Sequence, residues 1–408
     1  MQYQRHDFDN GIRIIHQRVK SPVAHFGIII NTGSRDELDS EQGVAHFIEH
    51  TIFKGTKKRK SFHILNRLDS VGADMNAYTT KEETCLYASF LKEHLQRTIE
   101  LFADISINST FPQKEIEKEK DVIIDEINSY RDNPSEEIFD EIEDIVFEGN
   151  SLGRNILGTK ESVTNLKRSN IFKFIKRTYH TDQIVICSVG DYDFNIVINQ
   201  CIKYFSEIQT YKRTIVRKPP EIYIPRTIIR KKAQHQAHCI IANKAYNSMD
   251  DKRSILFLLN NILGGPGLNS RLNLGIREKY GFCYNLESNY TVYSDSGIVS
   301  IYLGTDFDYL EKTINLVLKE LSKLRNNKLG TFQLHTAKQQ IKGQIAISND
   351  NNINELISMG KSIISYDSVE SLESIYSKIE AITSEELIEV ANEIFDNSQL
   401  TKLIYTKS

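Results

Sequence analysis

Short apolar runs and alternating apolar and polar positions mark the beginning of the chain as β structure. The segments 12–16 and 24–30 show these patterns, and we predict a strand for each. A helical pattern follows over 40–53, where Ser40 is a favoured N-cap residue type. The same signals predict further elements: helices over 62–71, 93–108 and 113–131, and strands over 76–79, 84–90 and 183–189.

The order of elements repeats in the second half of the chain. The repeat is predicted to hold a strand over 238–245, helices over 253–263 and 271–280, strands over 284–293 and 297–304, and a helix over 309–324. One helix of each half ends at a glycine, Gly72 and then Gly281. We therefore predict an α+β fold of two related α/β-sandwich halves, each a mostly antiparallel sheet covered by helices.

The segment between the two halves is rich in proline and basic residues. Pro219, Pro220 and Pro225 lie there, and proline at this density is typical of a linker. We predict a linker over 207–226, an N-terminal domain over 1–206 and a C-terminal domain over 227–408.

The composition limits the classes of function. Of 408 residues, 40% are hydrophobic and 26% charged, as in ordinary globular proteins. The net charge of −3 argues against a general nucleic-acid-binding protein, which needs a basic excess. The best apolar candidate for a membrane span, 254–265, is too short to cross a bilayer. We expect neither nucleic acid nor membrane as a partner.

The beginning of the chain and its cysteines bear on location. Residues 1–13 are polar and include acids, so they do not resemble a secretory signal. The five cysteines are scattered and form no C-x-x-C pair, which predicts buried, reduced thiols. Both features favour a cytoplasmic protein.

The strongest chemical signal is the pentapeptide His46-Phe47-Ile48-Glu49-His50. A helix advances by about 100° per residue, so His46, Glu49 and His50 project from one face of one turn. Two imidazoles at this spacing are a common zinc-binding pair, and a carboxylate beside them can take a proton from water. On the pentapeptide alone, a zinc site and two ordinary helical histidines both remain open.

A third ligand is expected from the helix predicted over 113–131. Glu119 and Glu126 are seven residues apart, within about 20° on one helix face. Ile123 and Ile127 neighbour that face, and a partly buried acid needs a partner such as a metal or a cation. The alternative is an exposed helix with ordinary Glu–Lys pairs.

Together these residues resemble the pitrilysin-type (inverzincin) zinc metallopeptidases, in which H-x-x-E-H precedes a distant Glu ligand at about this distance. Other segments resemble landmarks of that family: 32–37, 53–56, 157–159 and 189–191. The resemblance implies that His46, His50 and Glu126 bind one Zn²⁺ per chain. It also implies that Glu49 is the general base and that Glu119 orients a zinc ligand or balances charge.

The resemblance extends to groups that would contact a peptide. Arg277 and Tyr284, seven residues apart, match an Arg/Tyr pair that the family uses at the substrate and the transition state. The family's substrate-edge strand is matched by Asn76, Ala77, Tyr78 and Thr79. A peptide is expected to add there as a further strand.

The chain length resembles the short, single-half subgroup, which includes the mitochondrial processing peptidase and in which two chains pair. We expect a zinc-dependent endopeptidase or oligopeptidase that hydrolyses short or unfolded peptides in a closed chamber. A homodimer or a heterodimer with a related chain is expected. Two alternatives are a processing-peptidase subunit acting with a non-catalytic partner chain, and a non-catalytic assembly subunit.

Overall fold

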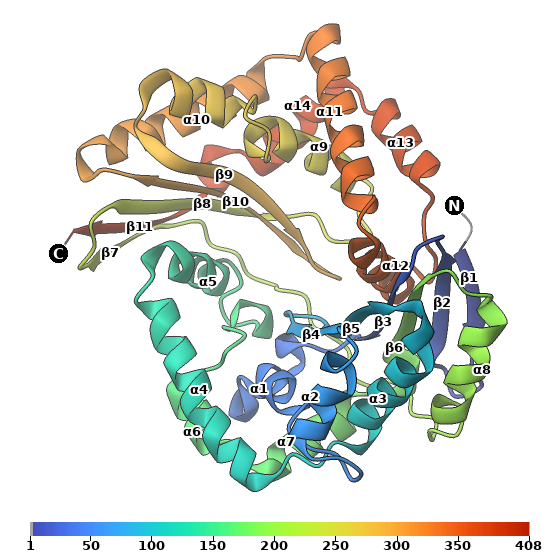
Figure 1. The fold of residues 1–408 in the computed structure, drawn as a ribbon. Helices are drawn as coiled ribbons and strands as arrows, with labels where there is room; N and C mark the ends of the chain where they lie inside the picture. Colours follow the sequence, from blue (N-terminus) through green and yellow to red (C-terminus); the bar gives the residue numbers. More distant parts are fainter. Residues whose placement is uncertain (1–2, 408) are drawn as a thin grey trace. The chain divides into compact units, whose positions relative to one another are not determined.

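The computed structural model describes residues 3–407, apart from the side chain of Tyr284, as two compact units (Figure 1). The first unit comprises Met1–Asn128, Arg154–Arg217 and Ile347–Ser371, and the second comprises Ser129–Gly153, Lys218–Ala346 and Leu372–Ser408. These units differ from the continuous domains 1–206 and 227–408, because each includes a segment from the other's stretch of chain. No helix or strand lies between Phe205 and Thr227, where we predicted the linker.

The first unit contains a six-stranded sheet in the order β1-β2-β6-β3-β5-β4. Its strands are β1 (Tyr3–Asp7), β2 (Arg13–Arg18), β3 (Val23–Ile30), β4 (Asp74–Thr79), β5 (Thr84–Leu91) and β6 (Ile184–Gly190). Only the β2–β6 pair is parallel, and the other four pairs are antiparallel. The strand β4 forms one edge of this sheet.

Helices cover both faces of the first sheet. The helices that lie wholly or mainly in this unit are α1 (Val44–Thr51), α2 (Ser61–Asp69), α3 (Leu95–Asn108), α4 (Gln113–Arg131), α6 (Lys160–Asn165), α7 (Arg168–Thr178), α8 (Phe194–Phe205) and α12 (Asn352–Tyr366). One core joins the sheet to α2, α3 and α8. A second core joins its other face to α12 through Leu356, Met359 and Ile363.

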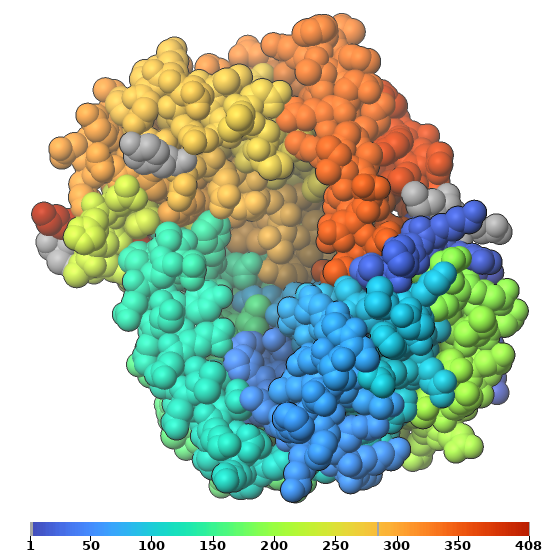
Figure 2. Space-filling view, in the orientation of Figure 1, coloured from blue at the N-terminus to red at the C-terminus, as the bar shows by residue number. Residues whose placement is uncertain are grey.

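Helix α12 comes from the last sixty residues of the chain but packs on strands built from its first half. It contacts β3 and β6, and Tyr3 donates a hydrogen bond of 2.5 Å to Glu355. In the space-filling view the orange atoms of this region lie against the blue atoms of the N-terminal strands (Figure 2). Apolar side chains of α12 therefore complete the first unit's core.

The second unit contains a five-stranded sheet in the order β7-β11-β8-β10-β9. Its strands are β7 (Thr227–Lys232), β8 (Ala237–Ala245), β9 (Cys283–Val292), β10 (Gly297–Thr305) and β11 (Thr401–Lys407). The β7–β11 pair is parallel and the other pairs are antiparallel. This order matches β2-β6-β3-β5-β4 of the first sheet, so the predicted α+β fold of two related halves is confirmed.

The helices of the second unit also lie on both faces of its sheet. They are α5 (Pro134–Val146), α9 (Arg253–Gly264), α10 (Leu310–Asn326), α11 (Thr331–Asn349, which crosses the unit boundary at its end), α13 (Leu372–Ala381) and α14 (Ser384–Ile394). The large core of this unit lies between the sheet and α9, α10 and α14. Helix α5, from the first half of the sequence, covers the other face. Tyr405 donates a hydrogen bond of 2.6 Å to Glu141 there.

The repeat is also visible in the glycines that end corresponding helices. Gly72 and Gly281 both have positive φ angles, 70° and 65°, which residues other than glycine rarely adopt.

Among the residues described, no helix is both long and apolar enough to cross a membrane.

Candidate metal centre

Helix α1 carries the H-x-x-E-H pentapeptide, and it begins later than its sequence pattern predicted. Asp39–Glu41 form a separate 3-10 turn, and α1 starts at Val44 after Gly43, whose φ is 87°. The prediction of Ser40 as N-cap is therefore wrong. The helix is capped instead by Glu37, whose carboxyl oxygens accept hydrogen bonds from Gly43 N–H (2.9 Å) and Ala45 N–H (2.8 Å).

Apolar packing brings α1 against α4. Val44, Phe47 and Ile48 are fully buried in a core that also contains Ile123 and Ile127 of α4. Because these side chains occupy one side of α1, the histidines and Glu49 project from another side. The packing thus places the histidines of one helix next to the carboxylates of the other.

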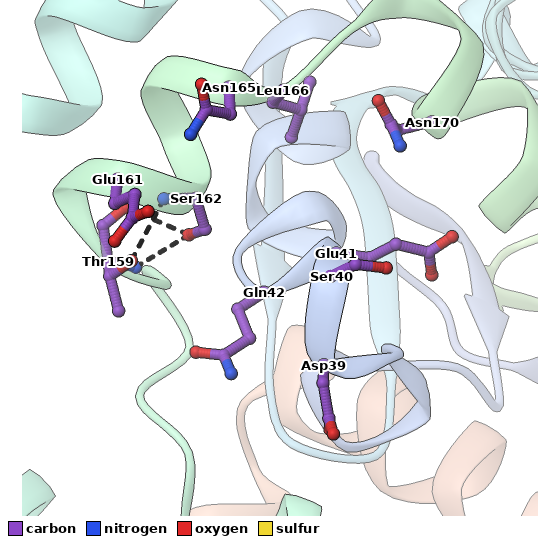
Figure 3. A pocket seen from close by; sticks show the side chains of 10 residues that line it. All are labelled: Asp39, Ser40, Glu41, Gln42, Thr159, Glu161, Ser162, Asn165, Leu166 and Asn170. Atoms are coloured by element: carbon purple, nitrogen blue, oxygen red, sulfur yellow. Dashed lines mark hydrogen bonds between the residues drawn. The ribbon is translucent and has the colours of Figure 1, made fainter.

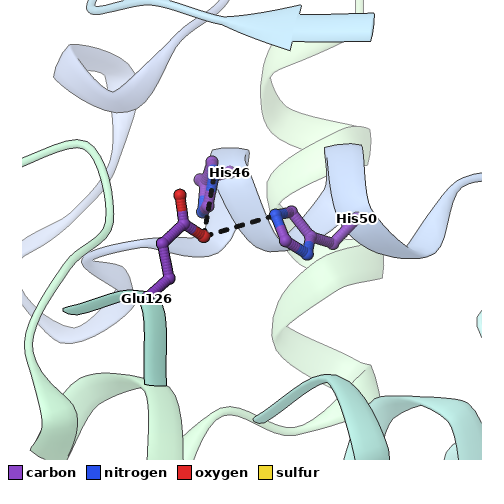
Figure 4. Close-up of side chains that lie close together, drawn as sticks. All are labelled: His46, His50 and Glu126. Atoms are coloured by element: carbon purple, nitrogen blue, oxygen red, sulfur yellow. Dashed lines mark ion pairs between the residues drawn. The ribbon is translucent and has the colours of Figure 1, made fainter. Parts of the chain in front are cut away.

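His46, His50 and Glu126 converge at this contact (Figure 4). Oε2 of Glu126 lies 3.8 Å from Nε2 of His46 and 3.6 Å from Nε2 of His50. One potential ligand atom from each residue lies within 4.8 Å of the other two. Ligand atoms around a tetrahedral Zn²⁺ are about 3.4 Å apart, as follows from bonds of about 2.05 Å. Two imidazoles and one carboxylate are ligands that zinc prefers, and His46, His50 and Glu126 are the residues that would hold it.

Burial controls the protonation of the first histidine. His46 is 7% exposed, and burial, with a smaller contribution from nearby His50, lowers its pKa to about 3. The ring is therefore neutral at pH 7, which is the form that binds a metal. Within residues 3–407 its Nδ1 has no hydrogen-bond partner.

A second carboxylate and a lysine support His50. Oε2 of Glu119 lies 3.1 Å from Nδ1 of His50, and Oε1 of Glu119 lies 2.6 Å from Nζ of Lys54. Glu119 is buried, with a side chain only 9% exposed. A carboxylate on the far nitrogen of an imidazole fixes its tautomer and orientation. Glu119 thus directs Nε2 of His50 toward Glu126, and Lys54 partly offsets the charge.

Glu49 lies on the same turn of α1, near the end of strand β4. Burial raises the pKa of its carboxyl, and the hydroxyl of Thr79 and nearby His50 partly oppose this shift. Helix α1 contacts β4 directly. A half-buried carboxylate beside two imidazoles is a suitable proton acceptor.

The predicted substrate residues Asn76, Ala77, Tyr78 and Thr79 all lie on β4 and pair with β5. No strand covers the outer edge of β4 in the part of the chain that is described. Ala77 packs toward the core of α2 and α3, whereas Tyr78 faces α12. Tyr78 donates to Glu83 at 3.0 Å, so its hydroxyl is already bound within the protein.

Arg277 and Tyr284 lie in the second unit. Arg277 is half-buried in Asn273–Glu278, a widened π-helical segment where we predicted an ordinary helix. Such segments occur often at functional sites. The backbone of Tyr284 belongs to β9, and its side chain lies outside the described residues.

Two residues that support the candidate site were not predicted from the sequence. Glu37 lies six residues before Gly43, too far for a local N-cap pattern, and Lys54 lies in a turn after α1. Their only sequence signal is that each belongs to a segment, 32–37 or 53–56, which flanks the pentapeptide.

A separate pocket of about 410 Å³ lies beside the turn that precedes α1 (Figure 3). Its lining comes from two segments of the first unit: Asp39, Ser40, Glu41, Gln42, Thr159, Glu161, Ser162, Asn165, Leu166 and Asn170. None of the predicted metal-binding or catalytic residues lines it.

Comparison with known proteins identifies the family. Models of insulinase (peptidase family M16) and of the peptidase M16 inactive domain match residues 13–160 and 165–341. An uncharacterized zinc protease of Bacillus subtilis (strain 168) is 30% identical over 404 residues, covering 98% of each chain. The chain belongs to peptidase family M16. The β subunit of the mitochondrial-processing peptidase of Bos taurus is 28% identical over 409 residues, covering 98% of this chain and 81% of that subunit.

Solved structures share the fold of this family member. A protease from Helicobacter pylori matches with a TM-score of 0.91 at 19% identity, covering 99% of both chains. A peptidase M16 inactive domain from Pseudomonas fluorescens matches with a TM-score of 0.93 at 18% identity, covering 100% of this chain and 98% of that one. The first family model spans His46, Glu49, His50, Glu119 and Glu126.

Proposed function

We propose that this chain is a zinc-dependent endopeptidase or oligopeptidase that acts on short or unfolded peptides. The observation that carries the proposal is the convergence of His46, His50 and Glu126 beside Glu49, with donor atoms that fit tetrahedral zinc. Membership of family M16 and the zinc-protease names of several relatives support it. We propose one Zn²⁺ per chain.

In this proposal a bound zinc ion supplies Lewis-acid chemistry and lowers the pKa of water toward neutrality. Glu49 accepts the proton from the attacking water on its carboxylate and delivers it to the leaving amine nitrogen. Glu119 holds His50 in place through Nδ1. Arg277 and Tyr284 stabilise the oxyanion of the tetrahedral intermediate, and we propose that a second chain supplies them.

The peptide is proposed to bind as an additional strand at the outer edge of β4. Backbone groups of an edge strand bind a peptide without requiring one particular sequence. Thr79 is the last residue of this strand, and helix α1, which carries Glu49, contacts β4. A peptide along Asn76–Thr79 would therefore run toward the proposed catalytic carboxylate.

The proposal is tested by Glu49→Gln and His50→Ala. Glu49→Gln should retain zinc but lose roughly 10²–10⁴-fold or more in kcat, because it removes the general base and not a ligand. His50→Ala should lose zinc as well. Glu117→Gln, an exposed change on α4, is the matched control and should leave both quantities unchanged. Near-full activity of Glu49→Gln would remove Glu49 from the mechanism.

Two further measurements define the substrate class. The purified chain alone should cleave members of a mixed peptide library, whereas a subunit that needs a non-catalytic companion would not. If the peptide enters a closed chamber, an oligopeptide should be cleaved in preference to a folded protein containing the same sequence. Equal cleavage of both would exclude such size selection.

A further inference from the structure

The segment Gly33–Glu37 immediately precedes the turn that leads into α1, and buried polar contacts hold it from several sides. Ser34 N–H donates to the carbonyl of Thr80 (3.1 Å), and Arg35 N–H donates to the carbonyl of Lys81 (2.9 Å). Both carbonyls belong to the turn between β4 and β5. The segment is thereby fixed to the hairpin that contains the proposed substrate strand.

The same segment binds the chain that leaves the first unit. The carboxylate of Asp36 accepts hydrogen bonds from Arg213 (Nη2, 2.6 Å) and from Arg217 (Nη2, 2.7 Å; Nε, 3.0 Å). Its side chain is only 1% exposed. Arg177 of α7 donates to the carbonyl of Asp36 at 3.2 Å. Buried charged contacts of this kind hold a backbone segment in one position.

Glu37 connects this fixed segment to α1. It is 4% exposed, and each of its two carboxyl oxygens accepts one hydrogen bond from a backbone N–H, that of Gly43 or that of Ala45. Arg154 fixes the Glu37 backbone by donating to its carbonyl at 3.1 Å. Two donors two residues apart lie at different angles around the helix axis, so accepting both restricts rotation of the helix about that axis.

Rotation of α1 matters because its histidines lie at the helix surface. A rotation of about 20° moves an atom 5–6 Å from the axis by roughly 2 Å. Metal sites tolerate departures of only about 0.2 Å in ligand distances. Helix α1 has only eight residues, Val44–Thr51, and three of them, Val44, Phe47 and Ile48, pack in the core, so a hydrogen-bonded restraint at its beginning adds to that packing in fixing the angle.

We propose that Glu37 is a positioning residue of the metal centre: its carboxyl group restrains the rotation of α1, in addition to the packing of its apolar face, and so the directions of His46 and His50. This inference rests on the proposed function of α1 as the zinc-binding helix. Glu37 touches neither metal ligand and acts only through the backbone of Gly43 and Ala45.

The test compares Glu37→Gln with Glu41→Gln. The amide keeps the shape of the side chain but offers one acceptor oxygen instead of two. Glu41 lies on the same loop, is buried and bonds to Arg177 of α7 without a hydrogen bond to α1, so it controls for loss of a buried acid. Each protein is loaded with Co²⁺ for its visible spectrum, and its zinc dissociation constant is measured by competition with a chelator.

Glu37→Gln should weaken zinc binding about tenfold or more and alter the Co²⁺ spectrum, as changes beside metal ligands typically do. Glu41→Gln should preserve both, whatever its effect on stability. A wild-type zinc affinity and spectrum in folded Glu37→Gln would overturn the inference. If Glu37→Gln does not fold, Glu37→Asp replaces it, because its shorter carboxylate reaches only one of the two N–H groups.

A metal-free measurement separates this inference from the proposed function. Hydrogen exchange of the apo protein should be faster over residues 43–51 in Glu37→Gln than in Glu41→Gln. If the wild type neither binds zinc nor cleaves peptides, the proposed function fails, and hydrogen exchange still decides whether Glu37 restrains α1. Equal exchange in both variants would overturn the inference.

Discussion

At the scale of single residues, burial sets the charge states of the groups around α1. It keeps His46 neutral, whereas it raises the pKa of Glu37 to about 8. For Glu37 the two backbone N–H donors and Arg154 oppose the effect of burial, and Glu41 adds to it. Burial thus favours the neutral form of both groups, the imidazole of His46 and the carboxyl group of Glu37.

The raised pKa of Glu37 predicts a pH dependence of stability. The folded protein holds this proton up to about pH 8, whereas an unfolded Glu releases it near pH 4.5. The contribution of this group to the free energy of unfolding is therefore full below pH 4.5 and is lost as the pH rises through 8. The loss should not exceed about 1.4 kcal/mol per pH unit.

The measurement is urea unfolding of the wild type and Glu37→Gln between pH 5 and 9. The variant lacks the titrating group, so the difference in unfolding free energy between the two proteins should shift with pH in the direction stated. A pH-independent difference would show that Glu37 has the same pKa in both states.

At the scale of elements, helix α12 packs closely on the first sheet. Gly360 of α12 lies so near the sheet that a Cβ there would lie 2.3 Å from Cδ1 of Ile29 and 2.6 Å from Sγ of Cys187. At Gly343, in α11, no described atom outside the helix's own nearby backbone lies within 4 Å of the same position. At Gly360, close packing thus leaves no room for a larger side chain, whereas at Gly343 there is room for one.

This contrast predicts opposite effects of two identical substitutions. Gly360→Ala should lower the free energy of unfolding by about 1–3 kcal/mol, because the added methyl group overpacks the core. Gly343→Ala should raise it by about 0.5–1 kcal/mol, because alanine favours a helix more than glycine does. Denaturant unfolding of both variants checks the signs. Equal stability of Gly360→Ala and wild type would mean that α12 does not pack closely on this sheet.

At the scale of the whole molecule, the proposed catalytic groups are divided between the two units. His46, Glu49, His50 and Glu126 belong to the first, whereas Arg277 belongs to the second. In the homodimer that we propose, each active site takes its zinc ligands from one chain and the Arg/Tyr pair from the other. A two-fold dimer would contain two equivalent sites of this kind.

The proposed dimer predicts complementation between two inactive variants. Glu49→Gln and Tyr284→Phe should each be nearly inactive alone. In a mixed dimer one site would combine both defects and the other would be intact. Random exchange of subunits should therefore restore about a quarter of the wild-type activity, since half of the dimers are mixed and each has one intact site.

The control mixes Glu49→Gln with Glu126→Gln. Both changes affect the zinc-binding half of a site, so no mixed dimer would contain an intact site and no activity should return. Absence of restoration with Tyr284→Phe, despite proven subunit exchange, would contradict a site shared between chains. Light scattering that showed a monomer at the assay concentration would contradict the dimer itself.

The sequence alone determined features that depend on local geometry. Helical spacing predicted one shared face for His46, Glu49 and His50. The periodicity of apolar residues, with glycine and proline at the ends of elements, predicted the repeated order of strands and helices. The α+β architecture follows from that order and is confirmed. The predicted beginning of the zinc-motif helix was wrong because its capping group is not a local one. Ser40 is a residue type favoured at N-caps, but the carboxyl group of Glu37 caps α1.

Only the tertiary structure decided which distant segments meet. Helix α5, from the first half of the sequence, packs on the sheet of the second unit, and α12, from the second half, packs on the sheet of the first. The sequence pattern makes one face of each helix apolar, but it does not specify which sheet that face covers. The contacts of Glu119 with His50 and Lys54 likewise join residues far apart in sequence. Local sequence patterns specify whether a segment forms a helix or a strand. Which elements pack together depends on the burial of complementary apolar surfaces, and these surfaces meet only in the folded chain.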